Sequence, residues 1–183
     1  FTIAAPNGNT NRTLTLPDAT GTLVTTASLP NPLTSGTAVV STSGTSIDFT
    51  SIPAWVKRIT VMFNEVSTNG SSSGLIQLGS GSFTTSGYLS QMVLVGVGTA
   101  NTTATAGMGW YHTGTAEAHT GSFVITNITG NTWVCIGSLR VYTQYISLSA
   151  AKVSLSGTLD RIRITTTNGT DTFDSGSINI MYE

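Results

Sequence analysis

The stretch DRIRITTTNGTDTFDSGSINIMYE, residues 160–183, decides the fold class of this chain. In its first half Ile162 and Ile164 alternate with two arginines, and in its second half Ile178 and Ile180 flank an asparagine. Such alternation turns one face of a β-strand towards a core and the other towards solvent. An Asn-Gly pair between the two halves is a turn signal. The stretch therefore predicts two amphipathic β-strands joined by a loop.

Period-two alternation recurs along the chain, whereas apolar residues at helical spacing are nearly absent. Short Gly- and Asn-containing turn signals separate the alternating segments. Together these patterns predict an all-β fold, an antiparallel β-sandwich of jelly-roll-like type with some ten strands from Thr37 onward. The clearest alternation lies in KRITVMFNEV (57–66), GSFVITNI (121–128) and TWVCIGSLRVY (132–142).

The sequence predicts two parts joined by a linker. Residues 1–26 hold two short β-like pieces with few bulky apolar side chains, which predicts an N-terminal β stem or anchor segment. Residues 27–36, ASLPNPLTSG, carry two prolines among Asn, Ser and Gly, and are typical of an extended linker. Residues 37–183 then form the β-sandwich domain, which is long enough to bury a core of its own.

Charged side chains are scarce: they make up 8% of the chain, against roughly 25% in a typical soluble domain. The net charge is −1. A nucleic-acid-binding protein needs a basic stripe for the phosphates and a membrane-surface protein needs a polybasic patch, so both classes are excluded. No apolar stretch approaches the roughly 20 residues of a membrane span, so we expect no membrane insertion. The 34 Thr and 22 Ser residues supply the solubility that charge usually provides.

The single cysteine, Cys135, excludes an intrachain disulfide. It alternates with Trp133 on a predicted strand. We therefore expect a small buried apolar residue rather than a nucleophile.

The run GSSSG, residues 70–74, matches the G-x-S-x-G pattern of hydrolases, with Ser72 at its centre. A nucleophile elbow needs a strand before the serine and a helix after it. Strand-like segments lie on both sides here, so we expect a hairpin loop and no enzyme activity.

The two histidines of the chain, His112 and His119, lie on either side of Glu117 in HTGTAEAH. Three such ligands within eight residues could hold a metal ion. The segment has no helical placement, however, and its spacing fits no familiar zinc pattern. We expect an exposed loop, no metal site and no cofactor.

The loop NGTDTFDSG carries Asn168, Asp171 and Asp174, whose oxygens are of the kind that calcium binds. It lacks the charge and the distal Glu of an EF-hand loop. We expect a turn held by Asx hydrogen bonds instead.

Trp110, Tyr111 and His112 lie between glycines in GMGWYHTG and are the candidate receptor- or glycan-binding residues. Aromatic rings with polar edges stack on sugars and anchor interfaces. The alternative is an ordinary strand with Trp110 in the core, and the sequence leaves both open.

Three segments of the chain resemble a known class of proteins, and this resemblance bears on the function. RTLTLPDATGTLVTT (12–26) resembles a recurrent segment of bacteriophage tail-fibre and related virion-fibre proteins. GTSIDFTSIPAWVKRITVMFNEVSTNG (44–70) and GTLDRIRITTTNGTDTFDSGSINIMYE (157–183) resemble the C-terminal domain of a group of phage and prophage fibre-like proteins. The resemblance implies a virion protein, made in the host cytoplasm, of a type that is usually a homotrimer with a distal domain that touches the host.

The opening segment offers little apolar surface in one copy. Leu14, Leu16, Leu23 and Val24 are nearly all of it. Three copies could pool these residues around an axis, so we expect them to form an oligomer or anchor segment.

The expected function is host attachment by the distal part of a homotrimeric fibre, through noncovalent binding of a host surface polysaccharide or protein. A capsid-decoration or head-fibre protein, which reinforces or extends the virion, is the alternative. A glycan depolymerase is a third, although the chain lacks the acidic groove and repeats expected of one. The expected partners are copies of the chain and other virion proteins, and no nucleic acid.

Overall fold

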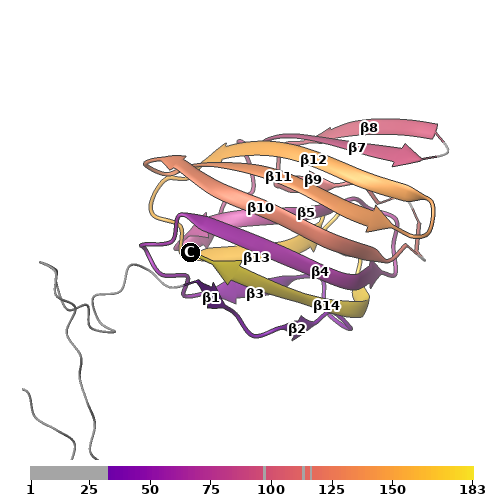
Figure 1. Ribbon diagram of the computed structural model, residues 1–183, viewed down its shortest axis with the longest axis horizontal. Helices are drawn as coiled ribbons and strands as arrows, with labels where there is room; N and C mark the ends of the chain where they lie inside the picture. Colours follow the sequence, from indigo (N-terminus) through magenta and orange to yellow (C-terminus); the bar gives the residue numbers. More distant parts are fainter. Residues whose placement is uncertain (1–32, 97, 113, 116) are drawn as a thin grey trace, which may run out of the picture. The chain divides into compact units, whose positions relative to one another are not determined.

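The computed structural model describes residues 33–183, except for 97, 113 and 116. In this part of the chain it has fourteen β-strands and no helix. The strand pairings are antiparallel and form two sheets that share one core (Figure 1). The predicted all-β antiparallel sandwich is confirmed. Within the described ranges, no helix has the length and apolar character needed to cross a membrane.

The larger sheet has nine strands in the described part of the chain. They are β1 (Thr34–Ser35), β2 (Val39–Val40), β4 (Arg58–Thr68), β7 (Leu89–Gly96), β8 (Gly98–Ala104), β10 (His119–Thr129), β11 (Thr132–Val141), β12 (Tyr145–Ser154) and β14 (Phe173–Tyr182). Strands β10, β11 and β12 form a meander that continues into the β7–β8 hairpin. On the other side of β10 lie β4 and then β14, with the short β1 and β2 beside β14.

The smaller sheet has five strands in the same described residues. They are β3 (Ile47–Thr50), β5 (Gly74–Ser80), β6 (Ser82–Phe83), β9 (Met108–Trp110) and β13 (Arg161–Thr166). Strand β13 lies between β3 and β5, and β9 and β6 pair with the two ends of β5. Figure 1 looks onto the larger sheet, with the smaller one behind it. Sheets of nine and five strands, with a meander in the larger, differ from the eight-stranded jelly roll.

The core lies between the two sheets and is built from the residues that alternate inwards. Arg161 and Arg163 of β13 lie outside it, and Arg163 pairs with Asp48 across the sheet. Folding removes the apolar surface of the core side chains from water, and this is the main stabilising contribution to the fold. The alternating segments of the sequence all contribute to this core: Ile59, Val61, Phe63, Phe123, Ile125, Trp133, Cys135, Leu139, Ile162, Ile164, Ile178 and Ile180.

A β-bulge interrupts β4 where it pairs with β10. Phe63 lies opposite Gly121, but Val66 lies opposite His119, so β4 has one residue more than β10 between these pairs. Glu65 takes up the extra length with a left-handed φ of 51°. Because the bulge shifts the alternation by one residue, Val66 and Phe63 both face inwards. The bulge therefore turns the end of β4 towards His119.

The described domain begins earlier than the sequence indicates. Thr34 and Ser35 were expected in the linker, but they pair with Tyr182 and Met181 at the sheet edge. A linker that contains prolines can still end in a short edge strand, because an edge strand needs few ladder hydrogen bonds. The predicted stem residues Leu14, Leu16, Leu23 and Val24 lie outside the described residues.

Candidate functional site

The predicted aromatic binding site is not on the surface of this domain. Trp110 is 3% exposed and His112 is 5% exposed, so neither ring offers a face to a sugar. Trp110 ends β9 opposite Gly74 of β5, and its ring covers the glycine so closely that a Cβ there would lie 1.9 Å from it. It also packs edge-on against Phe63, with ring centroids 5.1 Å apart. The alternative of a core Trp110 is therefore the one that the structure shows.

Tyr111 is half-buried and packs on a small cluster of Leu75, Met92 and Ala104. Its backbone N–H donates to Ser147 Oγ at 2.9 Å. Of the three candidate residues, only Tyr111 keeps part of its ring in solvent.

The two histidines lie inside the sandwich and not in an exposed loop, contrary to the sequence-based expectation. His112 follows β9 of the smaller sheet and His119 begins β10 of the larger one, so the connection between them crosses from sheet to sheet. Their ring centroids are 5.0 Å apart. The half-buried Glu117 approaches from this connection, with Oε2 3.6 Å from His112 Nδ1. One ligand atom from each of the three residues lies within 4.8 Å of the others.

Backbone carbonyls hold both imidazole rings in place. His112 Nε2 lies 3.0 Å from the Gly70 carbonyl oxygen. His119 Nδ1 lies 3.2 Å from the carbonyl oxygen of Val66, just after the bulge, and its Nε2 lies 3.3 Å from that of Tyr111. Burial, and then the neighbouring His112, lower the pKa of His119 to about 4. A neutral His119 has one N–H for two carbonyl groups.

The acidic loop between β13 and β14 is the Asx turn that the sequence predicts. Asn168 Oδ1 accepts hydrogen bonds from the backbone N–H groups of Thr170 and Asp171, at 3.0 and 3.1 Å. The Asp171 carboxylate accepts from the Asn168 side chain and from the Ser72 amide, and these bonds hold the pKa of Asp171 below its usual range. Asp174 instead accepts from Ser67. The two carboxylates thus have separate hydrogen-bonding partners.

Ser72 lies in the connection between β4 and β5, so a strand follows it where a nucleophile elbow requires a helix. Its backbone amide is used by Asp171. The sequence predicts a hairpin loop here, and a loop between two strands is what the structure has. It is not a hairpin, because β4 and β5 do not pair and the loop crosses from the larger sheet to the smaller one.

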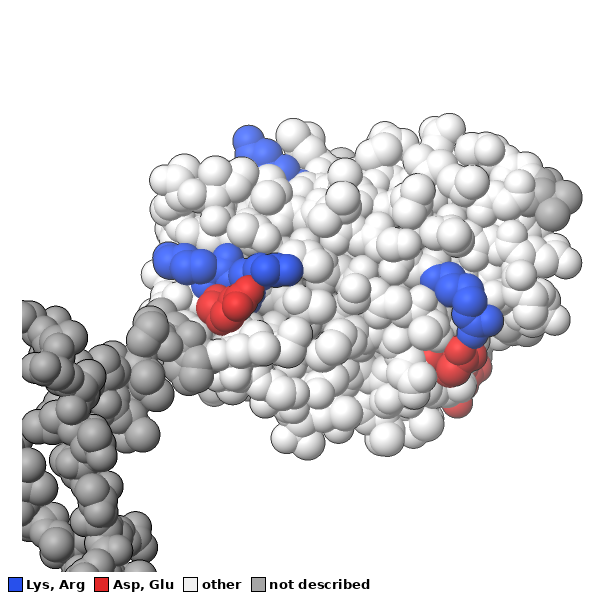
Figure 2. All heavy atoms as spheres, in the orientation of Figure 1, with Lys and Arg blue, Asp and Glu red and all other residues white. Residues whose placement is uncertain are grey.

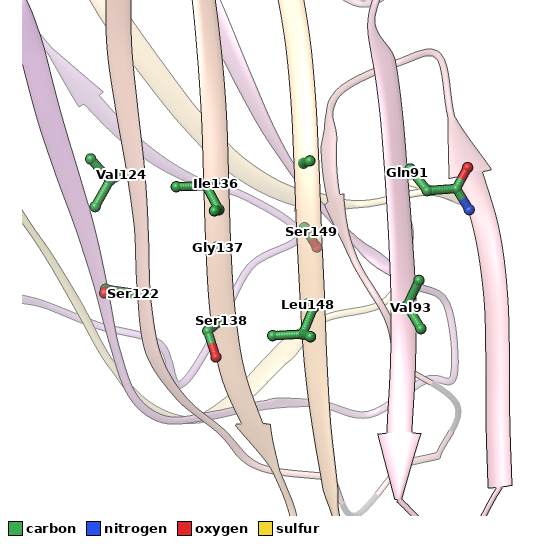
Figure 3. A pocket seen from close by; sticks show the side chains of 10 residues that line it. Gln91, Val93, Ser122, Val124, Ile136, Gly137, Ser138, Leu148 and Ser149 are labelled. Atoms are coloured by element: carbon green, nitrogen blue, oxygen red, sulfur yellow. The ribbon is translucent and has the colours of Figure 1, made fainter.

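A second candidate site is the outer face of the larger sheet, which the sequence analysis missed. Six side chains from four neighbouring strands make it apolar, and together they are called the apolar sheet face: Val93, Val95, Val124, Ile136, Ile146 and Leu148. Ile136 is 68% exposed, and Ile146 and Leu148 are nearly half exposed. Figure 3 shows Val124, Ile136, Leu148 and Val93 side by side on β10, β11, β12 and β7.

The apolar sheet face is hollowed where small residues separate the large ones. Ile136 pairs with Ala150, and Leu148 pairs with Ser138 across the β11–β12 ladder. Ser122 lies opposite Ser138 on β10. The resulting shallow depression has a volume of about 510 Å³. It can receive apolar side chains from another molecule.

Charges stand at the margins of this face. Arg140 pairs with Glu65, and Arg58 pairs with Glu183 at 3.1 Å. Figure 2 shows a few groups of charged atoms near the ends of the domain and a wide uncharged surface between them. The signal for this face was present in VCIGS and YISLSAA, where Ile136, Ile146 and Leu148 occupy positions that should be polar if one face were solvated.

Comparisons with protein-family models, curated proteins and solved structures found no match for this chain.

Proposed function

We propose that this chain is a structural, noncatalytic module of a bacteriophage virion: the distal part of a homotrimeric fibre that attaches to the host surface by noncovalent binding. The virion setting rests on the resemblance of residues 12–26, 44–70 and 157–183 to phage fibre proteins. The observation that supports assembly is the apolar sheet face. We take its occupant to be a second copy of this chain.

The composition of the surface supports a self-contact. The chain is rich in Thr and Ser, yet five of the ten large hydrophobic residues exposed in the described ranges lie on the outer sides of β7, β11 and β12: Leu89, Val95, Ile136, Ile146 and Leu148. Contiguous exposed apolar patches of this kind mark interaction sites on soluble proteins.

Electrostatics also favour a second copy as the occupant. Identical chains bring identical charges together, so a self-contact is easiest where the centre of the face is neutral. Here Arg140, at the margin of the face, is already paired with the acidic group of Glu65. Aliphatic residues beside a depression of small residues suit a dry contact between copies.

Attachment to the host follows from the proposal that the chain is part of a fibre. Three copies in one fibre raise the avidity of a weak contact. Because Trp110 and His112 are buried, the host contact is expected elsewhere on the trimer. A depolymerase receives no support from the described carboxylates. Asp48, Glu65, Asp160 and Glu183 pair with arginines, whereas glycoside hydrolysis needs two carboxylates that face each other.

The first experiment is the mass of the full chain in solution, by light scattering after size exclusion. Three times the chain mass of 19.0 kDa is expected, and a monomer at all concentrations would contradict the assembly proposal. The second experiment adds the purified chain to the parent phage and its host. We expect it to slow adsorption by competition. Unchanged adsorption, with antibodies to the chain labelling the capsid, would instead support a decoration protein.

A further inference from the structure

We propose that His112, His119 and Glu117 form a binding site for a divalent transition-metal ion, which ties the two sheets of the sandwich together. Such a site is independent of whether the chain belongs to a fibre. One histidine follows a strand of the smaller sheet, the other begins a strand of the larger sheet, and Glu117 lies on the connection between them.

The hydrogen bonds of the two rings leave one nitrogen of each for the ion. With its Nε2 proton on the Gly70 carbonyl, His112 presents the lone pair of Nδ1 on the side where Glu117 lies. With its Nδ1 proton on the Val66 carbonyl, His119 presents the lone pair of Nε2. Metal-binding histidines almost always donate their other N–H to a carbonyl or carboxylate in this way.

The contact between His119 and a backbone carbonyl group also favours a bound cation. Its Nε2 lies 3.3 Å from the Tyr111 carbonyl oxygen, so in the neutral ring a lone pair faces a lone pair. His119 is 2% exposed, and bulk water has little access to this contact. A cation between the two histidines would turn that nitrogen from an unfavourable neighbour of the carbonyl into a ligand.

The spacing of the ligand atoms fits a single ion. Atoms that share a tetrahedral zinc lie roughly 3.4 Å apart. His112 Nδ1 and Glu117 Oε2 are 3.6 Å apart, and the full set, which lies within 4.8 Å, needs a contraction of up to about 1.4 Å.

The donor set selects the class of ion. Two imidazoles and one carboxylate suit zinc, copper, nickel or cobalt, whereas calcium and magnesium prefer oxygen ligands alone. Three protein ligands leave a further position for water. Because Glu117 lies on the connection between the histidines, the bound ion would fix that connection as well as the two sheets.

The chain offers a clean background for the test. It has two histidines and one cysteine, and Cys135 is buried in the core with its pKa raised by burial to about 12. The full chain, prepared without a histidine tag, would be dialysed against Zn²⁺ and its metal content measured. We expect one zinc per chain. In Co²⁺ we expect visible absorption bands of tetrahedral nitrogen and oxygen coordination.

Glu117→Gln is the main variant because Glu117 is half-buried and the change keeps its shape. It should bind zinc at least about tenfold more weakly and lose the Co²⁺ bands. His112→Gln should do the same. Asp174→Asn, an exposed carboxylate outside the cluster, is the matched control and should bind as the parent chain does.

Thermal unfolding provides a second readout. Zinc should raise the melting temperature of the parent chain, EDTA should reverse the rise, and Glu117→Gln should show neither effect. Absence of stoichiometric zinc would overturn the proposal and leave a hydrogen-bonded cluster only. Equal zinc binding by the parent and both ligand variants would overturn it too, because the metal would then lie elsewhere.

Discussion

At the scale of single residues, Tyr88 shows how a buried polar atom holds two segments together. The residue is 1% exposed, and its hydroxyl accepts a hydrogen bond from the Leu78 backbone amide at 2.7 Å. Leu78 belongs to β5, so the phenol satisfies a strand amide that lies in the core. An unsatisfied buried donor costs far more than a typical hydrogen bond contributes.

Tyr88→Phe should therefore lower the free energy of unfolding by roughly 1–3 kcal/mol. The ring still fills its place, but the Leu78 amide loses its acceptor. Denaturant unfolding followed by fluorescence would measure the change. Tyr142→Phe, at a position 54% exposed, is the control and should leave stability unaltered. Equal stability of the two variants would show that the hydroxyl contributes nothing.

Cys135 leads to a second prediction at this scale. It is 6% exposed, and burial raises the pKa of its thiol to about 12. Because the thiolate is the reactive form, the native protein at pH 8 should react with an aromatic disulfide reagent only as fast as it unfolds. In denaturant one thiol per chain should react at once. Rapid labelling of the native chain would contradict the buried position.

At the scale of elements, glycines fit the large side chains of neighbouring strands. Gly137 of β11 lies opposite Phe123 of β10, and a Cβ at Gly137 would come within 2.4 Å of the phenyl ring. The ring is fully buried. Phe123 can therefore pack against the β10–β11 ladder because Gly137 has no side chain.

Gly137→Ala should destabilise the domain by roughly 1–3 kcal/mol, since a buried ring must move to admit a methyl group. Ser138→Ala, next along the strand with its side chain outwards, should change stability by less than about 0.5 kcal/mol. Both values come from denaturant unfolding at equilibrium. An unchanged Gly137→Ala variant would mean that Phe123 can repack.

Alternation predicted most of these elements because it reports directly which face is buried. The burial of Ile162 and Ile164, or of Phe123 and Ile125, can be predicted without knowing which strands pair with theirs. Met92, in contrast, is 1% exposed because of residues outside its own strand. Its place depends on β9 and β5, which cover it through Gly109 and Leu75 and are distant in sequence.

The histidine cluster could not be predicted for the same reason. The spacing of His112 and His119 fits no familiar metal pattern, and only the sheet-to-sheet crossing and the bulge at Glu65 bring the rings together. Familiar metal-binding spacings describe ligands on one secondary-structure element, whereas the His112, His119 and Glu117 cluster depends on how several strands pair. The burial of Trp110 likewise depends on Gly74, thirty-six positions away.

At the scale of the whole molecule, assembly through the apolar sheet face links stability to protein concentration. An oligomer that dissociates on unfolding melts at a higher temperature when the protein is more concentrated. We expect a rise of several degrees for a hundredfold increase in concentration. Differential scanning fluorimetry or calorimetry over that range would measure it.

Ile136→Asp tests whether the apolar sheet face is responsible. Ile136 is 68% exposed in one copy, so the change should leave the folded monomer intact while a buried aspartate prevents the contact between copies. The variant should have the mass of one chain and a melting temperature independent of concentration. Ile128→Asp, at a similarly exposed position where β10 turns into β11, is the matched control and should keep both the oligomer and the concentration dependence. If both variants behave like the parent chain, copies of the chain meet through another surface, and the apolar sheet face is left for a different partner.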